Sequence, residues 1–172
     1  MTSADRIVVL GGTFSPIHNG HRALLHHAFQ TASHDGDGDG HVVVGLTASE
    51  LAAEMRSDPS HAELIGSYAK RRDALGAELD RIGDAYSASA AISRLADPDG
   101  PAATREAVDA LVTSPEAKAQ RRAYGINERR VEAGLSPLEI HTAPFVVDEE
   151  GTRISSTRIR DGEIDVHGRH PD

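Results

Sequence analysis

The apolar residues of the chain form short continuous runs. Between these runs lie segments in which apolar residues recur at helical intervals. Runs at 7–10, 41–46 and 110–113 predict buried strands, because strands of a parallel sheet are covered on both faces. Weaker alternation over 86–94 predicts a fourth strand, and 138–147 predicts the last one. The pattern therefore predicts five strands.

Between these strands the apolar residues return at helical intervals. The predicted helices cover 22–32, 50–56, a longer stretch around Leu75, Leu79 and Ile82, and 116–134. Thr47 and Glu50 have capping-box spacing, Asp58-Pro59 ends that helix, and Gly134 is a C-terminal stop. Strands that alternate with helices predict an α/β fold: a single Rossmann-like domain over 1–172, with a five-stranded parallel sheet and helices on both faces.

Two loops are predicted from composition, at 33–40 and 96–101. The first contains alternating Asp and Gly over 35–40, which begins like the calcium loop of an EF-hand. The bidentate Glu of that pattern would stand at position 46, which is Leu46 in a predicted strand. A flexible connection is therefore the favoured interpretation.

The stretch from Gly11 to His21 directly follows the first strand and leads into a helix. Paired glycines let the backbone approach a ligand closely, and a helix N-terminus attracts anions, so the loop predicts a phosphate site. His18 and His21 share one face if the helix has begun by Asn19, and imidazole can donate to phosphoryl oxygens. The alternative is a glycine-rich turn with two surface histidines.

A second candidate stretch is Ile154 to Arg160. Its Ser and Thr hydroxyls can cap a helix while exposed backbone N–H groups hold phosphate oxygens. Residues two apart on a helix diverge, so Arg158 and Arg160 should not reach one phosphate group equally. The alternative is a short capped helix with surface arginines.

Two further features bear on a ligand site. Ser114 directly follows the predicted strand 110–113. In an α/β sheet the ligand crevice lies at this carboxyl end of the strands. Lys70, Arg71 and Arg72 form the densest positive cluster, which is either a solvated helix face or a second phosphate site on the acceptor side.

Composition excludes several classes of protein. A net charge of −9, with Lys70 and Lys118 as the only lysines, disfavours nucleic acid as a partner. The absence of cysteine excludes disulfides, thiolate metal sites and thiol nucleophiles. No apolar run reaches the roughly 18 residues that suggest a transmembrane helix. The first residues do not resemble a signal peptide, so we expect a cytoplasmic protein that does not interact with membranes.

The two stretches together resemble signatures of the nucleotidylyltransferase superfamily. Residues 11–21 resemble Gly-Gly-Thr-Phe-Asp-Pro-x-His-x-Gly-His, with Ser15 in place of Asp. Residues 154–160 resemble Ile-Ser-Ser-Thr-x-Ile-Arg, with Arg160 at the arginine of the motif and Arg158 at its variable position. Further matches in order resemble the archaeal-type phosphopantetheine adenylyltransferases: Gly45 to Thr47, Tyr68, Arg71, Gly100-Pro101, Ser114, Ile126-Asn127, Gly134-Leu135, Pro137-Leu138 and 162–165.

The resemblance implies transfer of AMP from ATP to 4'-phosphopantetheine, giving 3'-dephospho-CoA and pyrophosphate in coenzyme A biosynthesis. It implies Mg²⁺ carried by ATP, no dedicated metal site, and catalytic roles for His18, His21 and Arg160. The implied ATP-binding residues are Gly11, Gly12, Thr13, Phe14, His18, Gly20, His21, Ser114, Ile154, Ser155, Ser156, Thr157, Arg158 and Arg160. The implied acceptor-binding residues are Thr13, Arg56, Lys70 and Arg71.

Two alternatives stay open. Another nucleotidylyltransferase would use nicotinamide mononucleotide, FMN or a small alcohol phosphate as acceptor. The scarcity of aromatic residues, 3% of the chain, weakly disfavours acceptors with a ring, which usually stack on an aromatic side chain. The second alternative is a regulator that binds nucleotide without turning it over.

Overall fold

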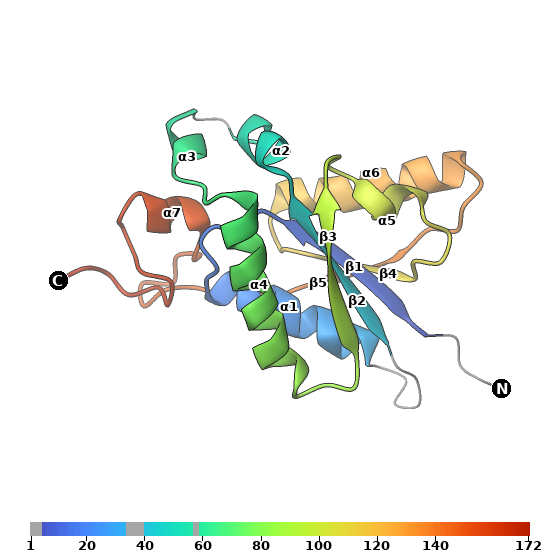
Figure 1. The fold of residues 1–172 in the computed structure, drawn as a ribbon, viewed down its shortest axis with the longest axis horizontal. Helices are drawn as coiled ribbons and strands as arrows, with labels where there is room; N and C mark the ends of the chain where they lie inside the picture. The colour runs from blue at the N-terminus through green and yellow to red at the C-terminus, as the bar shows by residue number, and fades with distance from the viewer. Residues whose placement is uncertain (1–4, 34–39, 57–58) are drawn as a thin grey trace.

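Strand β1 (Ile7–Gly12) lies at the centre of a five-stranded parallel sheet with the order β3-β2-β1-β4-β5 (Figure 1). The computed structural model describes residues 5–33, 40–56 and 59–172. The remaining strands are β2 (His41–Thr47), β3 (Ser89–Leu95), β4 (Ala110–Thr113) and β5 (Glu139–Thr142). The predicted parallel sheet is confirmed. Because strand order reverses on either side of β1, its carboxyl end opens into a crevice.

Helices cover both faces of this sheet (Figure 1). They are α1 (Asn19–Ala32), α2 (Ser49–Glu54), α3 (Pro59–Glu63), α4 (Tyr68–Gly83), α5 (Gly100–Thr104), α6 (Ala117–Glu132) and α7 (Ser156–Arg160). Helices α1 and α4 pack on one face, and α5 and α6 pack on the other. None of the helices in the described ranges is long and apolar enough to cross a membrane.

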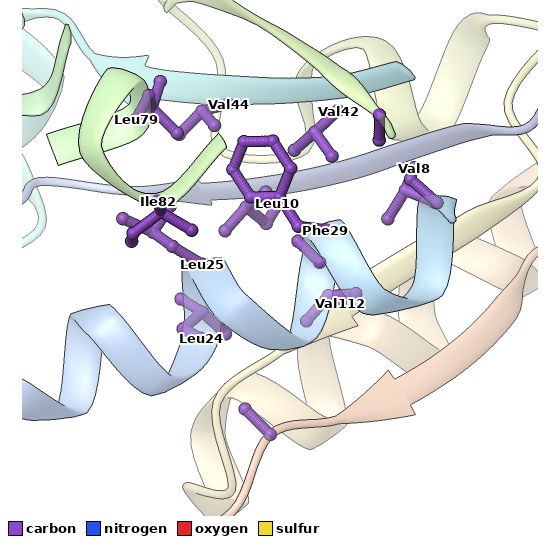
Figure 2. Packing of buried hydrophobic residues seen from close by; sticks show 14 of the residues in the cluster. Val8, Leu10, Leu24, Leu25, Phe29, Val42, Val44, Leu79, Ile82 and Val112 are labelled. Atoms are coloured by element: carbon purple, nitrogen blue, oxygen red, sulfur yellow. The ribbon is translucent and has the colours of Figure 1, made fainter. Parts of the chain in front are cut away.

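Side chains of β1 alternate between two hydrophobic layers, as the two-residue period of a strand requires. Val8 and Leu10 point into the larger layer, where they meet Leu25 and Phe29 of α1 (Figure 2). Val9 points to the opposite layer and packs with residues of α5 and α6. Both faces of β1 are therefore buried, which explains its continuous apolar sequence.

Several predicted boundaries differ from the structure. Helix α1 begins at Asn19 rather than at 22, β3 begins at Ser89 rather than at 86, and β5 ends at Thr142 rather than at 147. Helix α5 occupies the end of the predicted loop 96–101 and was missed, because five residues are too few to show a helical period. Residues 35–39, which carry the calcium interpretation, and Asp58 lie outside the described residues.

The predicted capping box at Thr47 is wrong. Ala48 is the N-cap residue of α2, and no side chain caps the helix there. Thr47 is the last residue of β2, and its hydroxyl contacts Thr13 and Arg71 instead. Burial at the carboxyl end of the sheet thus outweighs the local capping pattern.

Candidate active site

His18 caps the N-terminus of α1 with its imidazole ring. Its Nδ1 atom accepts hydrogen bonds from the backbone N–H groups of Gly20 at 3.1 Å and His21 at 3.4 Å. Because Nδ1 is the acceptor, the neutral ring carries its proton on Nε2 and can donate from that atom. Burial, aided by the positive charges of Arg153, Arg22 and Arg160, lowers the pKa of His18 to about 4.

His21 stacks on His18 and completes the histidine pair. The ring centroids lie 3.9 Å apart, and the ring centroid of Phe14 lies 4.8 Å from that of His21. Burial, followed by the influence of His18 and Arg153, lowers the pKa of His21 well below its usual value. Its Nδ1 atom is buried and meets no hydrogen-bond partner among the described residues. Both rings are therefore neutral hydrogen-bonding groups at neutral pH.

A buried arginine holds the loop that precedes the histidines. Arg71 is 3% exposed and donates to the carbonyl oxygens of Gly66 at 2.8 Å and Thr13 at 3.1 Å. It also donates to the hydroxyl of Thr47 at 3.4 Å, which in turn donates to the hydroxyl of Thr13 at 3.2 Å. The ends of β1 and β2 and the start of α4 are thus joined at Thr13.

The two sequence motifs meet beside this loop. Arg160 donates through Nη1 to the carbonyl oxygen of Ser15 at 2.5 Å, and the Ser156 hydroxyl donates to the carbonyl oxygen of Pro16 at 3.5 Å. The backbone N–H of Asn19 donates to the carbonyl oxygen of Val166 at 3.1 Å. Segments from opposite ends of the chain therefore form one site.

A cleft of about 240 Å³ lies between the two motifs. Both histidines and the 155–157 turn line it, together with Ser114 and Arg56. The predicted residues Gly11, Gly12, Gly20 and Ile154 also line this cleft. The structure thus brings most of the predicted ATP-binding residues to one cavity.

The two arginines of the second motif have different environments. Arg158 donates to the carboxylates of Asp148 at 2.6 Å and Glu163 at 3.0 Å, and to the carbonyl oxygen of Arg153 at 2.8 Å. The Nε atom of Arg160 is buried and has no hydrogen-bond partner among the described residues. Arg158 therefore anchors the turn. Arg160 bonds Ser15 and Thr157 and, like Arg158, is not part of the lining of the cleft, but it is the less engaged of the two arginines.

The predicted acceptor-binding residues also lie in different environments. Lys70 is exposed and does not line the cleft, and Arg72 pairs with Asp73 on the exposed face of α4. Arg56 lines the cleft, and burial lowers its pKa. Its Nε atom is buried without a hydrogen-bond partner in the part of the chain that the structure describes. The solvated-face interpretation thus fits Lys70 and Arg72.

A second cavity, of about 170 Å³, adjoins the first. Gly11, Gly12, Leu24 and Ser114 border both cavities. The second cavity is mostly apolar and has no aromatic side chain in its lining, which includes Leu10, Met55, Leu95, Pro98, Pro101, Ala102, Leu111, Ala123 and Ile126. The carboxyl end of β1 therefore separates a polar cavity from an apolar one.

Among the residues of this site that sequence reasoning missed are Thr47, Glu116 and Arg153. The position of Thr47 at the end of a predicted strand was a usable signal, because parallel strands present their carboxyl ends to the crevice. Arg153 lines the cleft, and its positive charge lowers the pKa of both histidines. No spacing pattern marked it.

Comparison with known proteins identifies a family and full-length relatives that this chain resembles. The cytidylyltransferase-like family matches residues 9–162. The chain is 40% identical over 162 residues to the phosphopantetheine adenylyltransferase of Methanosarcina acetivorans, covering 94% of each chain. It is 39% identical over 165 residues to the protein of the same name from Methanosarcina barkeri, covering 94% of this chain and 91% of that one.

A solved structure of an Archaeoglobus fulgidus protein of unknown function supports the fold. It superposes with a TM-score of 0.62 at 22% identity and covers 86% of this chain and 98% of that chain. At this identity the likeness concerns the fold alone.

Proposed function

The chain belongs to the cytidylyltransferase-like family, and we propose that it transfers AMP from ATP to 4'-phosphopantetheine, giving 3'-dephospho-CoA and pyrophosphate. The observation that carries this proposal is the 40% identity, over 94% of both chains, to a relative named phosphopantetheine adenylyltransferase. The convergence of the histidine loop and the 154–160 motif on one cleft supports it.

The neutral histidines fit a role as hydrogen-bond donors to phosphate. A phosphate oxygen of the acceptor attacks the α-phosphorus, and the bond to the bridging oxygen breaks as pyrophosphate leaves. The attacking oxygen is already anionic at neutral pH, so the reaction depends on alignment and on stabilising charge rather than on a base. His18 and His21 would contact the reacting phosphates, with Thr13 and Phe14 shaping the loop.

The leaving pyrophosphate would lie along the 154–160 motif. Ser155, Ser156 and Thr157 line the cleft, and Arg160 has a buried nitrogen atom available. Arg158 would act through the backbone, since its guanidinium is engaged by Asp148 and Glu163. The proposal therefore assigns the arginine clamp to Arg160.

The acceptor would enter through the apolar cavity. A pantetheine arm is a flexible chain without a ring, which suits a cavity without aromatic side chains in its lining. Its phosphate would lie near Thr13 and Arg56, with Arg71 holding the loop and offering a buried Nη2 atom that has no hydrogen-bond partner among the described residues. The phosphates would then meet where Gly11 and Gly12 border both cavities.

Mg²⁺ would be held mainly by the oxygens of ATP. The described residues contain no group of three His, Cys, Asp or Glu side chains arranged to bind a metal ion. Hydroxyl and imidazole groups line the cleft, which fits a metal carried in by the triphosphate. When bound, Mg²⁺ would supply positive charge to the phosphates. The cytoplasmic location and the independence from nucleic acid and membranes stay predictions.

One experiment distinguishes the proposed reaction from its alternatives. The protein is incubated with ATP, Mg²⁺ and, separately, 4'-phosphopantetheine, nicotinamide mononucleotide, FMN or glycerol phosphate, and the products are identified by mass. We expect 3'-dephospho-CoA and pyrophosphate from the first mixture. Preferential adenylylation of another acceptor would overturn the assigned acceptor, and ATP binding without any product would favour the regulator.

A further inference from the structure

Arg153 reaches into the cleft from a firmly held segment of backbone. The backbone of Arg153 pairs with that of Val147 in an antiparallel bridge, and the carbonyl oxygen of Arg153 accepts a hydrogen bond from Arg158 at 2.8 Å. The adjacent N–H of Ile154 donates to the carbonyl oxygen of Val146 at 3.0 Å. The backbone is thus fixed on both sides, while the side chain is partly exposed.

The guanidinium of Arg153 forms an ion pair with Glu116. Glu116 follows β4, whereas Arg153 precedes α7, and both line the cavity that contains His18 and His21. The side chains are 34% and 47% exposed, so the pair contributes little to stability and costs little to break.

Glu116 is not used to cap its own helix. It is the N-cap residue of α6, yet its carboxylate accepts no capping hydrogen bond. The carboxylate instead accepts a hydrogen bond from the hydroxyl of Ser114 at 3.3 Å and another from the guanidinium of Arg153. An acidic group in a cleft suited to a triphosphate would repel the ligand unless a cation neutralised it.

From this arrangement we propose that Arg153 binds the triphosphate of ATP and exchanges its partner Glu116 for phosphate oxygens when the nucleotide enters. The inference rests on the proposed function. A triphosphate offers more negative charge than one carboxylate, and arginine binds phosphate through paired hydrogen bonds, so the exchange favours the nucleotide. Arg153 would then add a second arginine to the one that the proposed function assigns to Arg160.

The charge of Arg153 already acts on the phosphate-binding groups in the free protein. It contributes to the low pKa of both His18 and His21. Pairing with phosphate would remove much of this influence and would let the histidines interact more strongly with the ligand. The effect follows from the position of the guanidinium on the lining of the cleft that also holds both rings.

The test measures the dissociation constants of ATP, pyrophosphate and 4'-phosphopantetheine by calorimetry on the full chain. For Arg153→Gln we expect ATP and pyrophosphate to bind about tenfold or more weakly, with 4'-phosphopantetheine unchanged. For Glu116→Gln we expect ATP to bind at least as tightly as in the wild type, because a competing carboxylate is lost. Arg72→Gln, which breaks an exposed ion pair on α4, is the matched control and should leave all three constants unchanged.

Two results would overturn the proposal. One is ATP binding by Arg153→Gln within twofold of the wild type. The other is equal weakening by Arg153→Gln and Glu116→Gln, since a purely structural pair is lost in either variant. Thermal melts identify unfolded variants, and Arg153→Lys, which keeps the charge, should recover part of the ATP affinity if the first variant folds poorly.

The product assay on the wild type keeps this inference separate from the proposed function. If the wild type makes 3'-dephospho-CoA and Arg153→Gln binds ATP normally, only the role of Arg153 fails. If the wild type makes no product, the proposed function fails, and the ATP and pyrophosphate constants still decide the role of Arg153.

Discussion

The imidazole of His18 lies against that of His21, with ring centroids 3.9 Å apart and ring planes 27° apart. Two charged rings at this separation would repel each other, so the stack requires at least one neutral ring. The positive charge of Arg153 disfavours protonation of either ring further. The arrangement therefore favours the neutral form of both rings.

The first prediction concerns the pH dependence of stability. The pKa of His18 is about 4 in the folded protein and 6.5 in the unfolded chain, so the unfolded chain binds more protons between these values. The stabilising contribution is present above pH 6.5 and is lost as the pH falls toward about 4. His18→Asn, which can still cap the helix, should show a smaller loss of unfolding free energy over this range in urea titrations. An unchanged pH slope would contradict the assignment.

The second prediction concerns the role of His21 in turnover. His21→Ala should lower the turnover number by about a hundredfold or more, because a donor to the reacting phosphates is lost. The measurement is the steady-state release of pyrophosphate by a variant shown to be folded. His27→Ala changes a histidine on the same helix that instead faces His141, and it should retain normal turnover. Normal turnover of His21→Ala would remove this ring from the mechanism.

The third prediction compares two helical glycines. A Cβ atom on Gly20 would lie 2.9 Å from Cε1 of His18, whereas a Cβ atom on Gly76 would meet nothing within 4 Å. Gly76→Ala should therefore stabilise the protein by about 1 kcal/mol. Gly20→Ala should displace the His18 ring and reduce turnover, with much of the stability retained.

Thermal unfolding and pyrophosphate release, measured on both variants, check this comparison. If Gly20→Ala and Gly76→Ala had the same turnover, the close packing of Gly20 against His18 would have no catalytic consequence.

The fourth prediction concerns the hydroxyl of Thr47. Thr47→Val removes its hydrogen bonds with Thr13 and Arg71, which should cost about 1 kcal/mol of unfolding free energy and lower turnover. Thr31→Val is the control, since this buried hydroxyl donates at 2.8 Å to the carbonyl oxygen of His27 within α1. The Thr31→Val variant should be destabilised to a similar degree as Thr47→Val, while its turnover stays normal. Equal turnover in the two variants would argue against a role for Thr47 in positioning the loop.

The sequence alone was sufficient to predict the parallel sheet and the two motifs of the site. Buried strands such as 7–10 show continuous apolar runs because both of their faces are covered. The glycine pair and the histidines of the first motif all lie within residues 11–21, so their geometry is set largely by local backbone conformation. The same holds for the turn at 155–157, where the Ser155 side chain caps α7.

Only the tertiary structure decided which side chains meet across the crevice. The hydroxyl of Thr47 donates a hydrogen bond to Thr13 instead of capping α2. Arg158 forms an ion pair with Asp148, and Arg153 forms one with Glu116. Each choice depends on a partner far away in the sequence or on how deeply the group is buried, and neither follows from local spacing. Local patterns determine elements and short loops, whereas the pairing of charges and hydroxyls depends on which strand ends the fold brings together.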